Sequence, residues 1–472
     1  MRRLARVAWR TLGLILVGIL AGAGCAAPSS LLGEDRLQLR EASPASVTPT
    51  PSLRLSPFRT PTSPPDPSAA PAVAFVPSVW AGGEGSLTVL GSTGWRAFDV
   101  PDIVRDIAVD PEGNAILAPG LRICDGRLLR DLLPRAPGGE QDAVAIDPSG
   151  RIWVGYYRGL AVLDEGRWVT VPLGAPDGSG PTAVRDLASD SRGVIWVATD
   201  AGLASYDGES WSSHTGAGSP GPTVIDCLLV DYLDRVWVGH ARGLSVLQGT
   251  IWRHFPLETV GFVRGLAADG KGRILAGGLY RGLSVYDGSG WSPYAGADTG
   301  LPSDRVTALA LDSLGRVWVG TRFGLAVHDG ERWLTYQEAT SGLGDNYVSA
   351  LAVGPAALPA LPEPGPVRYG RLVGRVTLHQ RPVAGASVAL CSELSLAQGF
   401  DGNPCEHAPL SLVTATAADG TFAFERVPAG HYAVAAEVEP GRWVTRTRVL
   451  SAVRYRVRSG ETTFVEVIEG AQ

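Results

Sequence analysis

Aromatic and arginine residues recur at one point of a pattern that repeats along the chain. They follow a short apolar run and precede a Gly-Leu pair. Aromatic rings stack on sugars, and arginines bind anionic groups through paired hydrogen bonds, so these side chains are candidate ligand-binding residues. The alternative is that they only cover a loop surface. The candidates are Tyr156, Tyr157, Arg158, His240, Arg242, Tyr280, Arg281, Arg322 and Phe323.

A second set of polar residues alternates in charge at another position, five residues before an aspartate that ends an apolar run. One interpretation is a ring of ion pairs between neighbouring repeats, which would satisfy one another where solvent is limited. The other is a polar funnel for a ligand or a cation. We favour the ion pairs. The set comprises Arg105, Asp142, Arg185, Asp226, Arg264 and Thr307, with Ser349 at the equivalent place after the last repeat.

The histidines and cysteines give little indication of catalysis. We place His240 on a loop, with no glutamate fixed beside it by spacing, and neither His214, His240 nor His407 has an acid at His-x-x-Glu spacing. We therefore predict no metal site and no cofactor. Cys391 and Cys405 flank a short insertion and are expected to form a disulfide in an exported protein, whereas Cys124 and Cys227 are expected to be buried thiols.

A repeated unit must position these residues. Its clearest copy is DSLGRVWVGTRFGLAVHDGERWLTY, which begins at Asp312. Successive copies lie 36 to 43 residues apart, the length of one four-stranded propeller blade. We predict an all-β fold with a seven-bladed β-propeller over residues 78–354. The position of the first tryptophan is filled in turn by Trp80, Leu117, Trp153, Trp196, Trp237, Leu275 and Trp318.

Each repeat predicts four strands, A to D. Strand A ends at Asp-x-x-Gly, strand B carries the tryptophan, Gly-Leu opens strand C, and an Asp-Gly turn leads to strand D. Antiparallel strands alternate in direction, so the D–A and B–C loops share one face, which holds both polar sets. The first copy lacks strand A. Residues 347–353 are therefore predicted to pair with it and close the ring.

The ends of the chain have a different composition. Residues 1–24 are predicted to be a lipoprotein signal peptide, with Cys25 as the lipidated residue; the alternative is ordinary signal cleavage that leaves Cys25 free. Residues 25–77 are expected to form a disordered linker rich in Pro, Ser and Thr. A Pro-rich linker, 355–366, precedes a predicted small Ig/transthyretin-like β-sandwich over 367–472.

The charge of the chain excludes one class of partner. Removing the signal takes away four arginines and no acidic residue, so the formal net charge changes from −6 to −10. An acidic protein has no broad cationic field for nucleic acid, and we predict that it binds none. The expected partners are a bacterial membrane, through the N-terminal lipid, and a glycan, peptide or protein ligand.

The repeat resembles the two-component regulator propeller family, which implies an extracytoplasmic sensor domain, in some members responding to oligosaccharides. No kinase, DNA-binding segment or membrane span is seen to follow it, which sets it apart from the usual sensor. The matching residues are Asp312, Gly315, Trp318, Gly320, Thr321, Gly324 and Leu325.

The C-terminal segment resembles the carboxypeptidase regulatory-like domain. The match lies in Gly374-Arg-Val, the run from Pro382, Asp419-Gly420-Thr-Phe and the run from Val427. The resemblance implies an accessory or adhesion module without catalytic residues.

Three functions remain open from the sequence. The first is a non-catalytic, extracytoplasmic, lipid-anchored protein that binds or senses a ligand. The second is a propeller enzyme of the lyase or hydrolase type, with residues at the channel mouth and His240 as its candidate acid or base. The third is a scaffold or adhesion protein. We favour the first, because no concentrated set of acid and base residues is present in the sequence.

Overall fold

The structure is a computed structural model. The predicted signal peptide, Cys25 and most of the predicted N-terminal linker lie outside the residues that it describes. Those residues are 76–132, 139, 141–157, 159–173, 182–216, 218–221, 223–256, 260–279, 281–294, 300–356, 358–392, 394, 403–406, 408–445, 447–448, 451–465 and 468–470. Among them, no helix is both long and apolar enough to cross a membrane.

The described part of residues 76–354 forms seven four-stranded antiparallel sheets. The first contains β28 (Ala350–Val353), β1 (Pro77–Gly82), β2 (Glu84–Gly91) and β3 (Gly94–Ile103). The second contains β4 (Asp106–Val109), β5 (Ala115–Ala118), β6 (Arg122–Cys124) and β7 (Leu129–Asp131). The third contains β8 (Gln141–Ile146), β9 (Ile152–Tyr156), β10 (Gly159–Asp164) and β11 (Arg167–Pro172).

The other four sheets follow in chain order. The fourth contains β12 (Val184–Ser189), β13 (Ile195–Thr199), β14 (Gly202–Tyr206) and β15 (Trp211–Ser213). The fifth contains β16 (Ile225–Val230), β17 (Val236–His240), β18 (Gly243–Gln248) and β19 (Ile251–Pro256). The sixth contains β20 (Phe262–Ala268), β21 (Ile274–Leu279), β22 (Gly282–Tyr286) and β23 (Trp291–Pro293). The seventh contains β24 (Val306–Leu311), β25 (Val317–Thr321), β26 (Gly324–His328) and β27 (Trp333–Tyr336).

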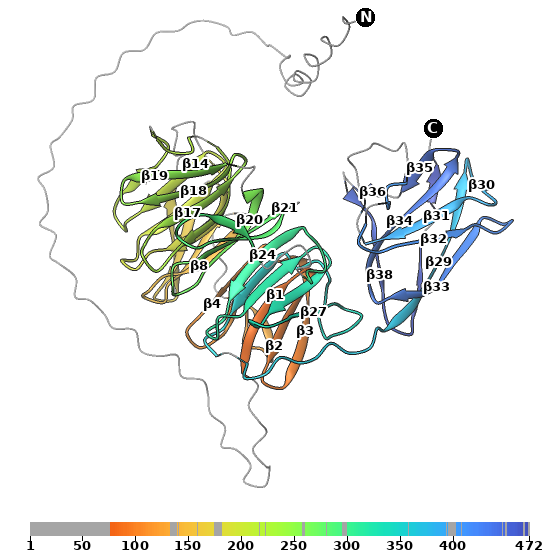
Figure 1. The fold of residues 1–472 in the computed structure, drawn as a ribbon, viewed down its shortest axis with the longest axis horizontal. Coiled ribbons are helices and arrows are strands. Elements are labelled where there is room, and N and C mark those ends of the chain that lie inside the picture. Colours follow the sequence, from red (N-terminus) through yellow and green to blue (C-terminus); the bar gives the residue numbers. More distant parts are fainter. Residues whose placement is uncertain are drawn as a thin grey trace, which may run out of the picture. The chain divides into compact units, whose positions relative to one another are not determined.

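The first strands of consecutive sheets contact one another around a closed circuit, from β4 through β8, β12, β16, β20 and β24 to β28 and back to β4. Strand β28 pairs with β1, with Val79 opposite Val353, so the ring closes through the two ends of the repeat region as the frame of the repeat predicts. Figure 1 follows the sheets from β2 and β3, in orange, through β17 and β18, in green, to β27, in turquoise. The all-β fold is as predicted.

Burial explains why the second strand of each blade is an almost unbroken apolar run. Every residue of β13, β17 and β25 is buried, because the neighbouring sheets cover both faces. The outer strands β11 and β19 are mostly exposed instead, with four of six residues in each open to solvent. Among the first tryptophans, Trp80 and Trp318 have no exposed surface. They belong to the core between blades rather than to a site.

In the third, fifth and seventh blades, the aspartate that follows the first strand is buried and accepts hydrogen bonds from an arginine and a tryptophan side chain. In the seventh blade, Asp312 Oδ2 accepts hydrogen bonds from Arg316 Nε at 2.6 Å and Trp318 Nε1 at 3.0 Å. Its Oδ1 accepts from the backbone N–H groups of residues 314 and 316. The third and fifth blades repeat the side-chain contacts, with Asp147 and Asp231 as acceptors. The aspartate of the repeat is therefore structural.

The glycine that ends the Trp-Val-Gly motif, which reads Leu-Ala-Gly in the sixth blade, makes room for the next blade. A Cβ atom on Gly155 would lie 2.3 Å from Val184 Cγ1, and one on Gly277 would lie 2.2 Å from Val306 Cγ1. Both valines open the first strand of the following sheet. A side chain at the glycine would push neighbouring blades apart, and this explains why the third residue of the motif is small.

Replacing Gly277 with alanine is expected to lower the free energy of unfolding by about 1–3 kcal/mol, because the added methyl group overpacks a stiff β-branched neighbour. Gly290→Ala is the matched control, since a Cβ there meets nothing within 4 Å. Denaturant unfolding of both variants measures the difference. Equal stabilities would show that the blades separate without cost and would contradict this account of the motif.

The C-terminal part forms two five-stranded sheets within the described residues. One contains β29 (Tyr369–Leu378), β30 (Arg381–Pro382), β33 (Thr421–Pro428), β39 (Thr462–Phe464) and β40 (Ile468–Gly470). The other contains β31 (Ser387–Cys391), β32 (Ser411–Ala415), β34 (Gly430–Glu439), β35 (Arg442–Thr445) and β38 (Arg454–Val457). A short pair, β36 (Thr447–Arg448) and β37 (Ser451–Ala452), completes it.

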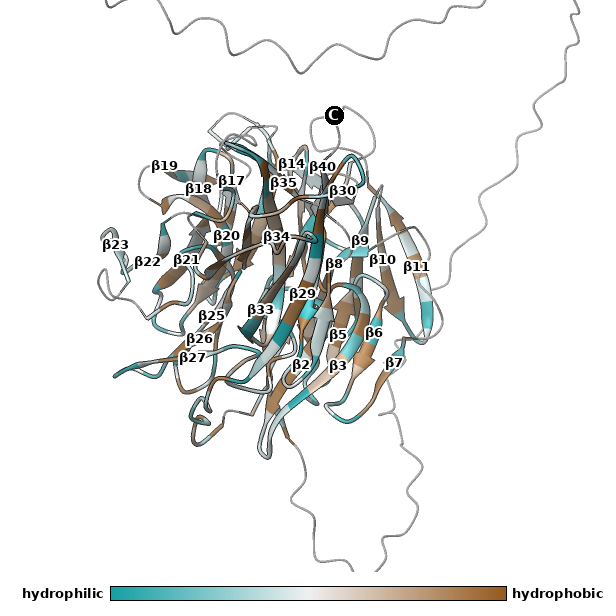
Figure 2. Cartoon of the chain, turned by 90° about the vertical axis from the view of Figure 1, so that its right-hand side faces the viewer, coloured by the Kyte–Doolittle hydropathy of each residue, from teal (hydrophilic) through white to brown (hydrophobic). Residues whose placement is uncertain are grey.

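The two C-terminal sheets share one core. Leu372 and Phe422 from the first sheet pack with Leu390 and Tyr432 from the second. Hydrophilic and hydrophobic residues alternate along β29, as expected of a strand with one buried face (Figure 2). Cys391 and Cys405 form a disulfide, and both are fully buried.

The predicted Pro-rich linker, 355–366, packs on the last blade where it is described. Leu358 is buried in the cluster that contains Trp318 and Tyr336. The Tyr336 hydroxyl donates a hydrogen bond to the Pro362 carbonyl at 2.8 Å. The segment is therefore held along the propeller instead of acting only as a spacer.

Candidate ligand-binding face

The B–C loop residues do not all have the exposure that a ligand-binding role needs. Tyr157 keeps 57% of its surface exposed. Arg242, Arg281 and Arg322 are also exposed, whereas Tyr156 and Phe323 are half-buried. Arg158 and Tyr280 lie outside the described residues. Exposed aromatic and cationic groups therefore come from several blades, and each follows the end of a second strand.

The environment of Arg322 shows how such a side chain is placed. Its guanidinium lies over the ring of Tyr347, 5.7 Å from the ring centroid. Its backbone N–H donates to the Arg305 carbonyl at 3.3 Å. A cation against an aromatic face is held in position while its edge stays available to solvent. The structure brings Tyr347, which the sequence analysis did not assign to the face, next to a candidate residue.

His240 differs from its prediction. It is the last residue of β17 rather than a loop residue, and only 4% of its surface is exposed. Its Nε2 lies 2.7 Å from Ser245 Oγ, and its Nδ1 accepts from the Arg242 N–H at 3.2 Å. Burial, together with the charges of Arg242 and His254, lowers the pKa of His240 to about 4. The imidazole is neutral and fully engaged at pH 7.

The charge-alternating residues occupy β-bulges. The pairing of the first and second strands skips Asp142, Arg185, Asp226, Arg264 and Thr307, one in each of blades three to seven. A bulge leaves one residue unpaired and re-aims its side chain. The alternation in the sequence thus corresponds to a single structural position repeated from blade to blade at the start of each first strand.

Two pairs of this ring meet across blades. Arg105 Nη1 lies 2.5 Å from Asp142 Oδ1, and Arg264 Nη1 lies 2.9 Å from Asp226 Oδ1. Arg185 is exposed between the two pairs. Both arginine side chains keep 40% or more of their surface in solvent, so each pair contributes little to stability.

The uncharged members of the ring bind backbone carbonyls instead. Thr307 Oγ1 donates to the Val348 carbonyl at 2.5 Å. Ser349 Oγ donates to the Val104 carbonyl at 2.6 Å. Each of these bonds also joins one blade to the next, so the uncharged residues link neighbouring blades as the ion pairs do.

A half-buried aspartate pair, Asp106 and Asp186, lies one residue further along the first strands. Asp106 accepts from the Val144 N–H at 2.8 Å, and Asp186 accepts from the Leu228 N–H at 2.7 Å, so each carboxylate joins two blades. Burial raises the pKa of Asp106 to about 6. Burial and the charge of Asp106 raise the pKa of Asp186 well above its usual value. Sequence reasoning missed both, although they stand where the other blades carry Ala, Cys or Gly.

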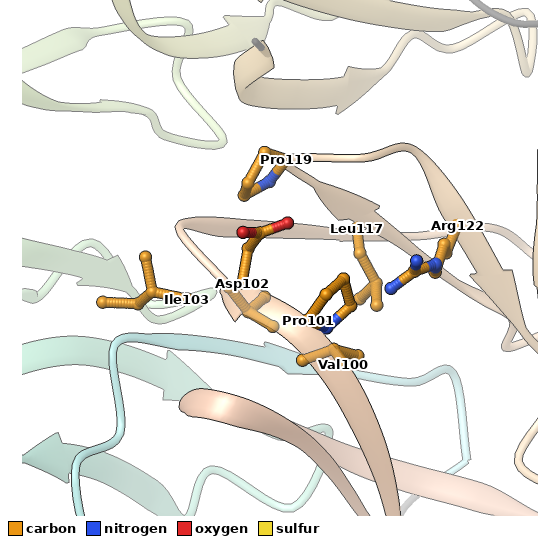
Figure 3. Close-up of a pocket in the computed structure, with 8 residues that line it drawn as sticks. Val100, Pro101, Asp102, Ile103, Leu117, Pro119 and Arg122 are labelled. Carbon is orange, nitrogen blue, oxygen red and sulfur yellow. The ribbon is translucent and has the colours of Figure 1, made fainter.

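A small hollow lies where the first and second blades meet on the same face. It is lined by Val100, Pro101, Asp102, Ile103, Val104, Leu117, Pro119 and Arg122. In Figure 3 the Asp102 carboxylate lies beside Pro119, with Leu117 between it and Arg122. This is the blade in which Leu117 replaces the first tryptophan and Pro119 replaces the glycine of the motif. The departure from the repeat thus coincides with a depression that combines apolar walls and one carboxylate.

One repeat matches a known family. Residues 300–323 match the model of the two component regulator propeller family. The match covers the segment before the seventh blade and the first two strands of that blade, and it confirms the resemblance inferred from this copy of the repeat. No curated protein matches the sequence.

Solved structures of similar fold include two bacterial surface proteins. The first is the extracellular domain of a protein from B. thetaiotaomicron described as a hybrid two component system, with a TM-score of 0.43 and 13% identity over 81% of this chain and 60% of that one. The second is PorZ, a surface component of the type-IX secretion system of Porphyromonas gingivalis, with a TM-score of 0.40 and 16% identity over 82% of this chain and 56% of that one. The chain thus spans less than two thirds of either.

An enzyme is also among the similar folds. Virginiamycin B lyase from Staphylococcus aureus has a TM-score of 0.40 and 11% identity over 50% of this chain and 84% of that one.

Proposed function

We propose that this chain is a non-catalytic, extracytoplasmic binding protein that holds its ligand on the propeller face formed by the B–C loops. The observation that carries the proposal is the exposure of Tyr157, Arg242, Arg281 and Arg322, which come from four blades of one ring. Stacking on the tyrosine and bidentate bonding by the arginines suit a glycan or another ligand with anionic groups.

The state of His240 favours binding over acid–base catalysis. A general acid or base must reach the reacting group and titrate near the working pH. The buried His240 ring is hydrogen-bonded at both nitrogens, and its pKa lies at about 4. The residue that was our candidate for catalysis therefore supports the architecture of β17 and β18.

A protein ligand is the second candidate. The same loops would contact a partner through the exposed tyrosine and arginines, residue types that are common in protein interfaces. The C-terminal sheets and the resemblance of their sequence to an accessory module support a role in adhesion equally. A screen that contains both glycans and peptides separates these ligand classes.

The proposed location rests on the sequence. The basic and apolar run of residues 1–24 and Cys25 support export and a lipid anchor. Metabolic labelling with a palmitate analogue tests the anchor directly: Cys25→Ser should abolish labelling, and a chain labelled equally with and without Cys25 would contradict it.

The test of the binding face is a thermal-shift screen of the chain from residue 26 against glycans and peptides. A ligand at 100 times its Kd stabilises the folded state by about 2.7 kcal/mol, which is a readable shift. The double variant Tyr157→Ala/Arg242→Ala should lose that shift and bind at least ~10-fold more weakly, as expected when two contacts are removed.

The control uses the opposite face of the propeller. Tyr232, 58% exposed, and Lys271, also exposed, lie in turns between first and second strands. Tyr232→Ala/Lys271→Ala removes the same kinds of group and should leave the shift unchanged. If both double variants reduce binding equally, the ligand is not held on the B–C face, and the proposal is wrong.

A further inference from the structure

Three side chains from distant parts of the sequence meet beside the last blade. Glu338 and Asp345 belong to the segment between β27 and β28, and His431 is the second residue of β34. The His431 Nδ1 atom lies 3.1 Å from Glu338 Oε1 and 3.4 Å from Asp345 Oδ1. One donor atom from each residue lies within 4.8 Å of the other two.

These side chains are held in place by their surroundings. Asp345 Oδ2 accepts from the Glu84 N–H at 2.8 Å, and Oδ1 accepts from the Tyr347 N–H at 2.9 Å. The Glu338 N–H donates to Asn346 Oδ1 at 2.8 Å. The arrangement is therefore preorganised by the first blade and by the segment itself, and it does not depend on mobile surface side chains.

Two of the three donor atoms are buried without a hydrogen bond. Glu338 is only 6% exposed, and its Oε1 has no hydrogen-bond partner. His431 Nδ1, which lies 3.1 Å from it, has none either. A buried polar atom without a partner costs about 1–3 kcal/mol. Two such atoms that face each other indicate that something else belongs between them.

The spacing fits ligands of one metal ion. Bonds of 2.0–2.2 Å from a tetrahedral ion place neighbouring ligand atoms about 3.4 Å apart. The distances of 3.1 and 3.4 Å from His431 Nδ1 agree with this. Two carboxylates balance a divalent charge. An imidazole ligand favours zinc and similar first-row metals over calcium and magnesium, which prefer oxygen.

We propose that Glu338, Asp345 and His431 form a zinc-type metal site that joins the C-terminal sheets to the propeller. The three protein ligands leave a fourth position for water. This site differs from the candidate ligand-binding face, and neither proposal depends on the other. It escaped the sequence analysis because the acids stand 93 and 86 residues before the histidine, far beyond His-x-x-Glu spacing.

A proton is the alternative occupant. Burial alone would lower the pKa of His431, but contact with Asp345 and Glu338 outweighs it and raises the pKa to about 9. A metal ion must therefore displace a proton at neutral pH, and its apparent affinity should rise with pH up to that value. An imidazolium in this place would bind no metal, so the two occupants predict different results.

The test is zinc binding by the chelator-treated chain from residue 26, measured by calorimetry and by metal content after dialysis. We expect one zinc per chain and a higher unfolding temperature with zinc, but no such increase with magnesium. Glu338→Gln and His431→Gln should each weaken binding at least ~10-fold, the effect of losing one of three ligands. Cobalt in place of zinc should give visible absorption bands that both variants lose.

The control is His379→Ala, which removes an exposed histidine in the C-terminal part of the chain. It should leave the stoichiometry and affinity unchanged. A loss of zinc in this variant would show that the metal binds at the surface. Circular dichroism checks that each variant folds. If Glu338→Gln or His431→Gln does not fold, Asp345→Asn replaces it in the test. Absence of a bound zinc, or zinc retained with equal affinity by Glu338→Gln and His431→Gln, would overturn the proposal.

Discussion

Asp312→Ala should lower the free energy of unfolding by about 3–5 kcal/mol, the cost of leaving one member of a buried ion pair without its partner. The Arg316 side chain is only 7% exposed and donates to Asp312 at 2.6 Å. Trp318 Nε1 donates to the same oxygen at 3.0 Å. Alanine would leave a buried cation and a buried N–H group without acceptors and would also release the turn that Asp312 Oδ1 stabilises.

The sixth blade offers the matched comparison. Asp269 pairs with Arg273 at 2.6 Å, but the arginine is 49% exposed, and Leu275 stands in place of the tryptophan. Asp269→Ala should therefore cost only about 1 kcal/mol, since water replaces most of what the arginine loses. Denaturant unfolding of the two variants measures the difference. Equal losses of unfolding free energy would show that burial adds little to the stability contributed by the contact in the seventh blade.

The fold was predictable because the repeat records local packing. Asp312 and Trp318 stand six residues apart because the aspartate accepts a hydrogen bond from the indole N–H of the tryptophan. The same spacing and the same bond recur at Asp147 and Trp153. The glycine two residues after the tryptophan gives space to the next blade. The residues that make these contacts recur in the sequence and so identify the blades. Because the first repeat lacks strand A, the sequence also indicates which strand closes the ring.

The candidate site was less predictable because exposure depends on the backbone between the motifs. His240 stands where a loop was expected, yet β17 continues through it and Ser245 binds its ring. The charge alternation was visible in sequence, whereas the bulge that aims each side chain was not. Asp106 and Asp186 were overlooked because a lone aspartate in an apolar strand has no spacing to recognise.

Contacts between distant segments are the hardest to foresee. Glu338 and His431 belong to parts of the chain with different periodicities, and nothing in either local sequence points to the other. Asp345 fixes the segment before β28 to the first blade, and His431 contacts that segment at Glu338 and Asp345. The polar residues that recur in the repeat, such as Asp312, stabilise the blades. The proposed metal ligands Glu338, Asp345 and His431 lie outside the repeated motif and could not be found from it.

Removing the disulfide should destabilise the C-terminal sheets by about 3 kcal/mol, the loop-closure contribution of a link across some 15 residues. Cys391 and Cys405 are 14 residues apart and fully buried. They pack with Trp443 and Ala435 in a small buried cluster. The double variant Cys391→Ala/Cys405→Ala keeps this apolar character, so the loss reports mainly the link.

Reduction provides the internal control for that variant. Dithiothreitol should lower the unfolding midpoint of the native chain towards that of the double variant and leave the variant itself unchanged. Among the described residues, the other cysteines are Cys124 and Cys227, which are buried thiols. They and Cys25 are common to both proteins, so they do not contribute to the difference. If mass spectrometry shows the link reduced while the native midpoint stays constant, the packing of Cys391 and Cys405 against Trp443, and not the covalent bond, supplies the stability.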